Sequence, residues 1–305
     1  SRTNAIPLAE RSALDRWILS RLNSLVKLCT ERYDDYDPTP AVRAIEDFVQ
    51  EQLSNWYVRL GRRRFWKSES SLDKQAAYDT LFECLRVVAQ LMSPVAPFFG
   101  DWLYRNLRNS LVETGFAGYP ALEAESVHLS KWDAVQSELI DEAAEERMEM
   151  AQRITSMVLS LRKKSNIRVR QPLSKIMVPV MDARIREQLE EVKLLILNET
   201  NVKHLEYVGE DAEMIVKKIR PDFKALGPKF GKMMKEAAAR LQQFSAAEIN
   251  ELQRNGEIAL VLNGETVMVS RADVEILTED IPGWLVAAEG AYTVALDVTI
   301  SEQLK

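Results

Sequence analysis

Apolar residues recur at every third or fourth position through the first third of the chain, the spacing that places them on one face of an α-helix. Turn-forming residues such as Asp34, Asp37 and Pro38 separate these stretches, and Asp37 or Thr39 can cap the second one. The stretches cover residues 12–33, 39–56, 78–92 and 93–107. Four amphipathic helices with short connections predict an antiparallel helical bundle.

The pattern changes beyond residue 134. Residues 135–164 contain no glycine or proline, and their apolar spacing favours one long helix with a basic end. Further along, stretches with strand-like and helix-like spacing alternate. The strand-like ones are 176–181 and 204–208, the helix-like ones are 184–197, 232–244 and 246–255, and residues 214–219 are ambiguous.

The C-terminal residues have mostly strand character. Two apolar runs flank Asn263-Gly264, a dipeptide typical of the tight turn of a β-hairpin. We therefore predict a mostly α fold, an antiparallel helical bundle followed by a smaller α/β C-terminal region. The expected domains are a bundle over 1–134, a long connecting helix and basic strand over 135–182, and an α/β domain over 183–305.

Length and composition fit a globular protein of two or three domains, with 305 residues of which 46% are hydrophobic. No apolar run approaches the roughly 18 residues needed to cross a bilayer, so we expect no membrane span. Cys29 and Cys84 fall inside apolar helical patterns, which favours buried thiols in the cytoplasm over a disulfide. The missing initiator methionine indicates a fragment of a longer protein.

The residues that most enzymes need are scarce. His128 and His204 have no acidic or cysteine partner at ligand spacing, so we interpret them as surface or core histidines. Two isolated cysteines are too few for a zinc site, and no phosphate-cradling glycine pattern is present. Gly227 to Gly231 come nearest, and we interpret them as a basic turn. We expect a non-catalytic chain without metal or cofactor.

Positive charge is concentrated although the net charge is -6. Residues 59–67 and 161–175 hold five and six cations without an acid, and residues 217–240 hold eight cations against Asp222 and Glu236. Acidic residues concentrate instead between 133 and 149. Such basic stretches are the local potential that phosphate binding requires.

The strongest local signal lies in residues 55–67, where four arginines, one lysine and four aromatic residues share thirteen positions. Guanidinium groups pair with phosphates, and splayed RNA bases stack on aromatic or guanidinium planes. The alternative is structural, with the aromatic residues in the core and the arginines tied to acids such as Glu46 and Asp47. Composition leaves both interpretations open.

The second basic segment, residues 161–175, joins the end of the long helix to a strand. Arg162, Lys163 and Lys164 are also explained by the negative end of the helix dipole. Arg168 and Arg170 alternate around a valine, so on an extended strand both side chains would project to one side.

Taken together, these segments resemble the C-terminal region of isoleucyl-tRNA synthetases, which are class I aminoacyl-tRNA synthetases. The similarity rests on ordered motifs that read LDRWILSRL, LSNWYVR with FW, LMSPVAPF, SVHL, IRVRQPL and FKALGPKFG. They lie at residues 14–22, 53–66, 91–98, 126–129, 167–173 and 223–231. The resemblance covers roughly residues 14–231.

The resemblance implies that the bundle is an anticodon-binding domain and that the C-terminal part adds contacts to the anticodon stem-loop of an isoleucine tRNA. The implied tRNA-binding residues are Trp56, Arg59, Arg62, Arg63, Arg64, Trp66, Lys67, Arg168, Arg170, Gln171, Lys224, Lys229 and Lys232. Phosphate contacts would supply the grip, and a few polar or aromatic side chains would identify unstacked bases.

Departures from the family pattern are informative. The HIGH and KMSKS motifs are absent, so the catalytic and editing domains of the same polypeptide, with their ATP and Mg²⁺, lie outside this chain. No cysteine-rich zinc module is present, which indicates the eukaryotic-like type of the family. We expect a monomer.

Two alternatives stay open at this stage. One is a protein-interaction scaffold built on the bundle and the acidic segment 133–149. The other is the equivalent region of a valyl- or leucyl-tRNA synthetase, which shares the bundle but is disfavoured by the run from Arg62 to Trp66.

Overall fold

The computed structural model describes residues 5–66, 71–114, 122–180, 182–209, 216–262, 264–279 and 282–299. The chain divides into two compact units, Ser1–Glu146 and Arg147–Lys305. Within the described ranges, every helix is too short or too polar to span a lipid bilayer. The domain boundaries expected after residues 134 and 182 stay a prediction.

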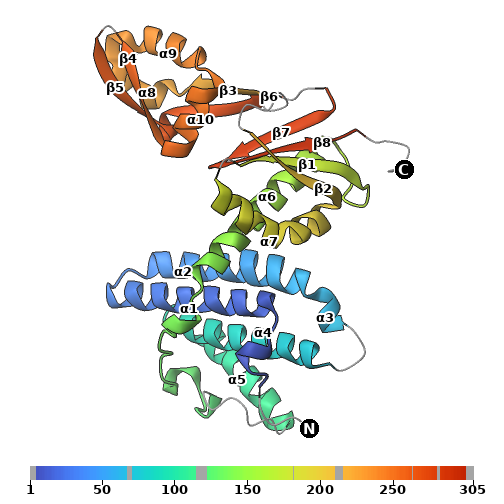
Figure 1. The fold of residues 1–305 in the computed structure, drawn as a ribbon. Coiled ribbons are helices and arrows are strands. Elements are labelled where there is room, and N and C mark those ends of the chain that lie inside the picture. Colours follow the sequence, from blue (N-terminus) through green and yellow to red (C-terminus); the bar gives the residue numbers. More distant parts are fainter. Residues whose placement is uncertain are drawn as a thin grey trace. The chain divides into compact units, whose positions relative to one another are not determined.

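The first unit is the predicted helical bundle (Figure 1). Its helices are α1 (Ala13–Asp34), α2 (Pro38–Asp47), the π-helical stretch η2 (Phe48–Val58), α3 (Arg62–Trp66), α4 (Leu72–Met92) and α5 (Pro97–Thr114). The second predicted helix is thus α2 with η2, whose wider turns interrupt the regular helical spacing. The bundle fold is confirmed.

Helix α1 begins where the sequence predicts, because Ser12 and Asp15 form a capping box. The Ser12 hydroxyl accepts a hydrogen bond from the Asp15 amide, and the Asp15 carboxylate accepts one from the Ser12 amide. Apolar side chains including Trp17, Ile18 and Leu22 are buried along one face. Burial of this stripe against α2 and α4 stabilises the helix more than its intrinsic propensity does.

Two predicted helix starts were too early. The amides of Val95 and Ala96 donate to the Met92 carbonyl, closing a turn, so α5 begins at Pro97 and not at Ser93. Helix α6 (Glu142–Lys164) begins seven residues later than expected. Its start is fixed by Asp141, whose carboxylate accepts a hydrogen bond from the Ala144 amide at 2.9 Å.

The second unit contains a four-stranded sheet in the order β2-β1-β8-β7 (Figure 1). Its elements are β1 (Leu173–Pro179), α7 (Ala183–Thr200), β2 (Val202–Val208), β7 (Trp284–Glu289) and β8 (Tyr292–Asp297). β1 and β2 are parallel and connected by α7, whereas β8 is antiparallel to both β1 and β7. The predicted basic strand therefore shares a sheet with the C-terminal strands.

The chain between β2 and β7 has an apolar core of its own, which includes Leu226, Leu241 and Val269. Its elements are β3 (Val216–Pro221), α8 (Phe223–Phe230), α9 (Met234–Gln242), α10 (Ala246–Asn255), β4 (Glu257–Leu262), β5 (Glu265–Ser270) and β6 (Val274–Glu279). β4 and β5 form the predicted hairpin, and Gly264 has a φ of +85° in its turn. Its neighbour Asn263 lies outside the described residues.

The predicted basic turn at Gly227 to Gly231 is wrong. These residues include the end of α8. That helix starts at Phe223 because the carboxylate of the preceding Asp222 accepts hydrogen bonds from the Lys224 and Ala225 amides. The helix accommodates Pro228 and ends at Gly231, whose φ of +46° suits a residue without a side chain.

Candidate nucleic-acid interface

The arginine-rich segment forms the short helix α3 and the residues just before it. Arg59, Arg62 and Arg63 are exposed, and Trp66 is 74% exposed. The Arg62 guanidinium lies 5.1 Å from the centre of the Trp66 ring, a cation–π contact. The surface of α3 thus presents guanidinium groups beside an exposed indole.

The other aromatic residues of this segment are buried. Tyr57 and Phe65 pack edge to face inside the bundle, and Trp56 is only 5% exposed. Arg59 lies over the Trp56 ring, 5.5 Å from its centre. The structural interpretation therefore holds for these three rings, and stacking of a base on Trp56 has no support in this arrangement.

Gly61 makes the close packing of α3 possible. A Cβ atom at this position would lie 3.0 Å from both the Tyr57 carbonyl oxygen and the Phe65 ring. A side chain at position 61 would therefore require the Phe65 ring or the Tyr57 backbone to shift.

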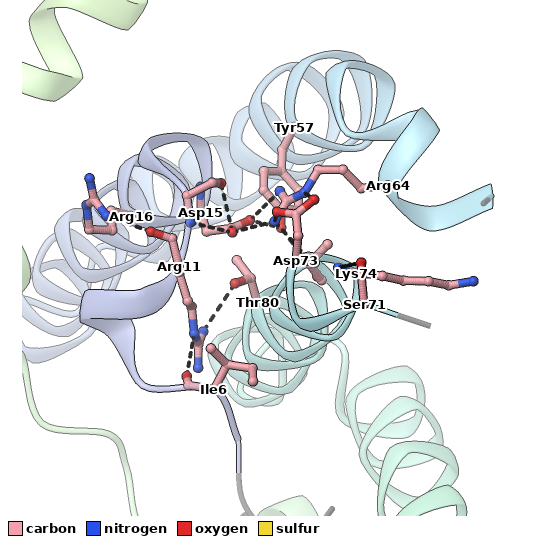
Figure 2. Close-up of polar contacts among 12 residues, drawn as sticks. Ile6, Arg11, Asp15, Arg16, Tyr57, Arg64, Ser71, Asp73, Lys74 and Thr80 are labelled. Carbon is pink, nitrogen blue, oxygen red and sulfur yellow. Dashed lines mark hydrogen bonds and ion pairs between the residues drawn. The ribbon is translucent and has the colours of Figure 1, made fainter. Parts of the chain in front are cut away.

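Arg64 differs from its neighbours, because two carboxylates hold its guanidinium (Figure 2). Its Nη1 and Nη2 atoms donate to the two carboxylate oxygens of Asp15 at 2.8 and 2.7 Å, and its Nε donates to Asp73 at 3.0 Å. Arg64 thereby ties α3 to α1 and to the start of α4. Its charge is compensated within the protein, so we remove it from the set of phosphate-binding residues.

The electrostatics of this cluster agree with its geometry. Burial raises the pKa of Asp15, but hydrogen bonds from Arg64, Tyr57 and Ser12 outweigh it and lower the pKa overall. Burial and the Asp15 carboxylate together raise the pKa of Tyr57, whose hydroxyl donates to Asp15 at 2.6 Å. At neutral pH Asp15 is therefore ionised and Tyr57 is protonated.

Sequence reasoning missed both acids of this cluster. It named Glu46 and Asp47 as partners of the arginines, whereas Arg64 pairs with Asp15 and Asp73. One signal was present, since Asp15 interrupts an otherwise apolar helix face. Lys67, another predicted site residue, lies outside the described residues.

In the second unit, Arg168 and Arg170 are exposed, as a phosphate-binding role requires. They do not lie on a strand, because β1 begins only at Leu173. Residues 168–171 form a turn that is closed by the Gln171 amide, which donates to the Arg168 carbonyl at 3.0 Å. Gln171 is half-buried, and its side-chain amide donates to the Pro172 carbonyl.

Arg162 lies in the last turn of α6, which fits the helix-dipole interpretation, but its side chain is buried and cannot contact a phosphate. Its side chain is 1% exposed and donates to the carbonyl oxygens of Arg168, Gln171 and Asn201 at 2.9 to 3.2 Å. Burial lowers the pKa of Arg162. Arg162 thus supports the turn from inside the protein.

The third basic stretch is divided among different roles. Lys224 and Lys232 are exposed, whereas the Lys229 ammonium pairs with Asp273 at 2.5 Å. Burial raises the pKa of Asp273, but hydrogen bonds from Lys229 and Ser270 outweigh it and lower the pKa. Lys224 borders an open cleft of about 500 Å³ together with Arg220 and Phe223.

The histidines lie at the surface. His128 is exposed, with its Nε2 atom 3.2 Å from the Pro97 carbonyl oxygen, and His204 is exposed on β2. Across the described ranges, no group of three or more histidine, cysteine or acidic side chains is arranged to hold a metal ion.

Comparisons with known proteins agree with this arrangement. Residues 15–177 match the family described as the anticodon-binding domain of tRNA ligase. The isoleucine–tRNA ligase of Bacteroides thetaiotaomicron is 51% identical over 300 residues, which are 98% of this chain and 25% of that protein. The isoleucine–tRNA ligase of Porphyromonas gingivalis is 47% identical over 99% of the chain, which matches 25% of that protein. That of Thermus thermophilus is 36% identical over 99% of the chain, which matches 28% of that protein. The chain spans about a quarter of the length of these curated relatives.

Proposed function

The chain belongs to the family of anticodon-binding domains of tRNA ligases, and we propose that it holds the anticodon arm of an isoleucine tRNA within a longer isoleucine–tRNA ligase. The resemblance inferred from the sequence motifs is thereby confirmed at the level of the family. The eukaryotic-like type stays a prediction.

The exposed surface of α3 is the observation that supports the proposal most directly. Arg62 and Arg63 in α3 and Arg59 just before it are exposed, and the exposed Trp66 ring lies beside Arg62. Guanidinium groups suit the phosphates of an RNA stem, and an indole suits an unstacked base of its loop.

The basic residues of the second unit support the same function. Arg168 and Arg170 on the 168–171 turn, and Lys224 in α8, are exposed cations at positions that the family motifs include. Lys232 is an exposed cation directly after the last motif. Most contacts between proteins and nucleic acids go to the phosphate backbone, so scattered cations of this kind supply affinity, not base identity.

The reaction of the longer enzyme, ATP-dependent attachment of isoleucine to tRNA, is part of the proposal. We place its ATP and Mg²⁺, together with the catalytic and editing domains, in the parts of the longer protein that this chain does not match. This chain then contributes tRNA recognition without catalysis.

We extend the proposal to a monomer in the cytoplasm. Cys29 and Cys84 are buried free thiols, which support a reducing compartment such as the cytoplasm. Sedimentation of the purified chain tests the monomer, and a concentration-dependent dimer would contradict it.

Titration of the chain with isoleucine tRNA at several salt concentrations tests the function. If the chain binds phosphates, the logarithm of its association constant for tRNA falls linearly with the logarithm of the salt concentration. The slope is roughly -0.7 to -0.9 for each phosphate contact. A flat salt dependence would contradict the proposal. Parallel titration with valine tRNA decides between isoleucine and the valyl alternative, and the names of the relatives favour isoleucine.

The protein-scaffold alternative has one observation in its favour. At the start of α5, the side chains of Phe98 and Trp102 are 91% and 59% exposed. They lie outside the basic clusters, so F98A/W102A is a matched aromatic control for RNA binding. We expect this variant to bind tRNA with the affinity of the wild type; a lower affinity would extend the RNA-binding surface to α5.

A further inference from the structure

The turn at residues 168–171 is built on a buried cation. The Arg162 Nη1 atom donates to the carbonyl oxygens of Arg168 and Gln171 at 3.2 and 2.9 Å, and its Nη2 atom donates to that of Asn201 at 3.0 Å. Within the described part of the chain no carboxylate pairs with Arg162. Among the described residues its buried Nε atom has no hydrogen-bond partner, so only carbonyl oxygens contact the guanidinium and its positive charge stays uncompensated beneath the turn.

Asn201 completes this support. It ends α7 in the left-handed conformation, with φ 50° and ψ 51°, and its side-chain amide donates to the carbonyls of Val169 and Arg170 at 2.8 and 3.2 Å. With Arg162, it therefore engages all four successive carbonyls of the turn. The inward direction of these carbonyls is fixed by two side chains from elsewhere in the second unit.

The N–H groups of these peptides point to the side of the turn opposite their carbonyls. In a trans peptide the N–H points away from the preceding C=O, so the amides of Val169 and Arg170 point away from Arg162 and Asn201. Over the described ranges neither amide donates to another protein group, and the side chains of both residues are exposed. Two backbone donors and two guanidinium groups, from Arg168 and Arg170, thus share the outer side of one turn.

We propose that the 168–171 turn is a phosphate-binding site that takes one phosphodiester of the tRNA backbone. The amides of Val169 and Arg170 and the guanidinium groups of Arg168 and Arg170 donate to its oxygens, while Arg162 and Asn201 act as positioning residues. Successive backbone amides that converge on one side form a concave anion site, and charge-assisted hydrogen bonds strengthen it. This inference rests on the proposed function, since it names the part of the tRNA that this turn contacts.

The test variant for the positioning role is N201G. Glycine adopts a φ of 50° without strain, so this substitution keeps the backbone at the end of α7 and removes only the tether to the turn. We expect N201G to lower the affinity of the chain for isoleucine tRNA on the order of tenfold, the size of one lost charge-assisted hydrogen bond. Circular dichroism and urea unfolding verify that the variant is folded.

N201G in an R168Q/R170Q background tests whether Asn201 acts on tRNA binding through the turn or through the fold as a whole. We expect R168Q/R170Q alone to weaken binding and to make the salt slope shallower by roughly 0.7 to 0.9, the value for one phosphate contact. N201G should have a smaller further effect in that background, because only the two amide contacts remain to be lost. An equal loss caused by N201G in both backgrounds would overturn the inference, because Asn201 would then act through the fold.

A set of anticodon stem-loop RNAs, each with one neutral methylphosphonate linkage, identifies the phosphate. One linkage should weaken binding to the wild type and have a smaller effect with R168Q/R170Q, in which only the two amides can contact that phosphate. If the chain binds tRNA with the expected salt slope but no linkage is coupled to the turn, the inference fails and the proposed function stands. If the chain does not bind tRNA, both fail.

Discussion

Arg64 and Asp15 form a bidentate ion pair across 49 residues of sequence, in which Nη1 donates to Oδ1 at 2.8 Å and Nη2 donates to Oδ2 at 2.7 Å. The Asp15 side chain is fully buried, whereas Arg62 and Arg63, the two residues before Arg64, are exposed. One arginine of the run therefore fixes α3, and the other two face solvent. This division underlies the first three predictions.

We predict that D15N destabilises the first unit by roughly 3 kcal/mol, the usual cost of removing one member of a buried ion pair. The remaining Arg64 charge would lie 15% exposed beside a neutral amide. Urea unfolding followed by circular dichroism measures the change. R63Q serves as control, because substitution of an exposed arginine without a buried partner typically changes stability by less than about 0.5 kcal/mol. If D15N and R63Q change the free energy of unfolding equally, the Asp15–Arg64 ion pair does not stabilise the fold.

The same pair predicts a pH dependence. Because its hydrogen bonds outweigh burial, the pKa of Asp15 lies below its ordinary value of 3.8 in the folded protein. A carboxylate with a lowered pKa stabilises the fold above its unfolded pKa, and this stability is lost as the pH falls through the folded value. The difference in unfolding free energy between wild type and D15N should therefore shrink below pH 3.8. A difference that stays constant in acid would exclude this linkage.

We predict that substitution of the exposed arginines changes the affinity for tRNA without changing the stability of the fold. R62Q/R63Q should lower affinity for tRNA and make the salt slope shallower by roughly 0.7 to 0.9 for each lost phosphate contact. The free energy of unfolding of this variant should equal that of the wild type, because neither side chain is buried. Filter binding across a salt series provides the measurement. Unchanged affinity and slope would assign both arginines to a solvated surface without a role in RNA binding.

Trp66 predicts a fluorescence signal. Stacking of a base on this 74% exposed ring should quench its emission, and the quenching should be absent in W66F. W66A should lose roughly 1–3 kcal/mol of binding free energy, while W66F should retain most of the stacking. Identical affinities for W66A and wild type would mean that the ring contacts no base.

The two thiols provide a test that is independent of RNA. Cys29 and Cys84 are both 0% exposed, and burial raises the pKa of Cys29 to about 12 and also raises that of Cys84. Only the thiolate is reactive, so both should resist a chromogenic disulfide reagent in the native protein and react rapidly in urea. Rapid reaction of either thiol in the native state would show that its helix opens or is packed differently.

The elements that the sequence predicted well are those with local signals. The start of α1 next to Ser12, the periodic apolar face of that helix and the glycine turn at Gly264 each depend on neighbouring residues. Ser245 caps α10 in the same way, through a hydrogen-bonded pair with Glu248. Local hydrogen bonds and periodic burial can be inferred from a single sequence, because they need no knowledge of distant contacts.

The rest of the candidate site depended on long-range partners. Nothing near Arg64 in the sequence indicates Asp15, and nothing near Arg168 indicates Asn201. Alternating Arg168, Val169 and Arg170 predicted a strand, but hydrogen bonds from Arg162 and Asn201 bend these residues into a turn. The sequence therefore predicts which segments are basic, whereas tertiary contacts decide which cations face the solvent.

The order of strands in the second unit also has a consequence for protein synthesis. β1 lies between β2 and β8, so its second partner leaves the ribosome only after the whole helix-and-hairpin portion, residues 216–279, has been made. That portion has its own apolar core, so we expect it to fold before β8 is made. During this time the edge of β1 that later pairs with β8 has no partner strand. A translational pause before Tyr292 would prolong this state, in which β1 is open to pairing with another nascent chain.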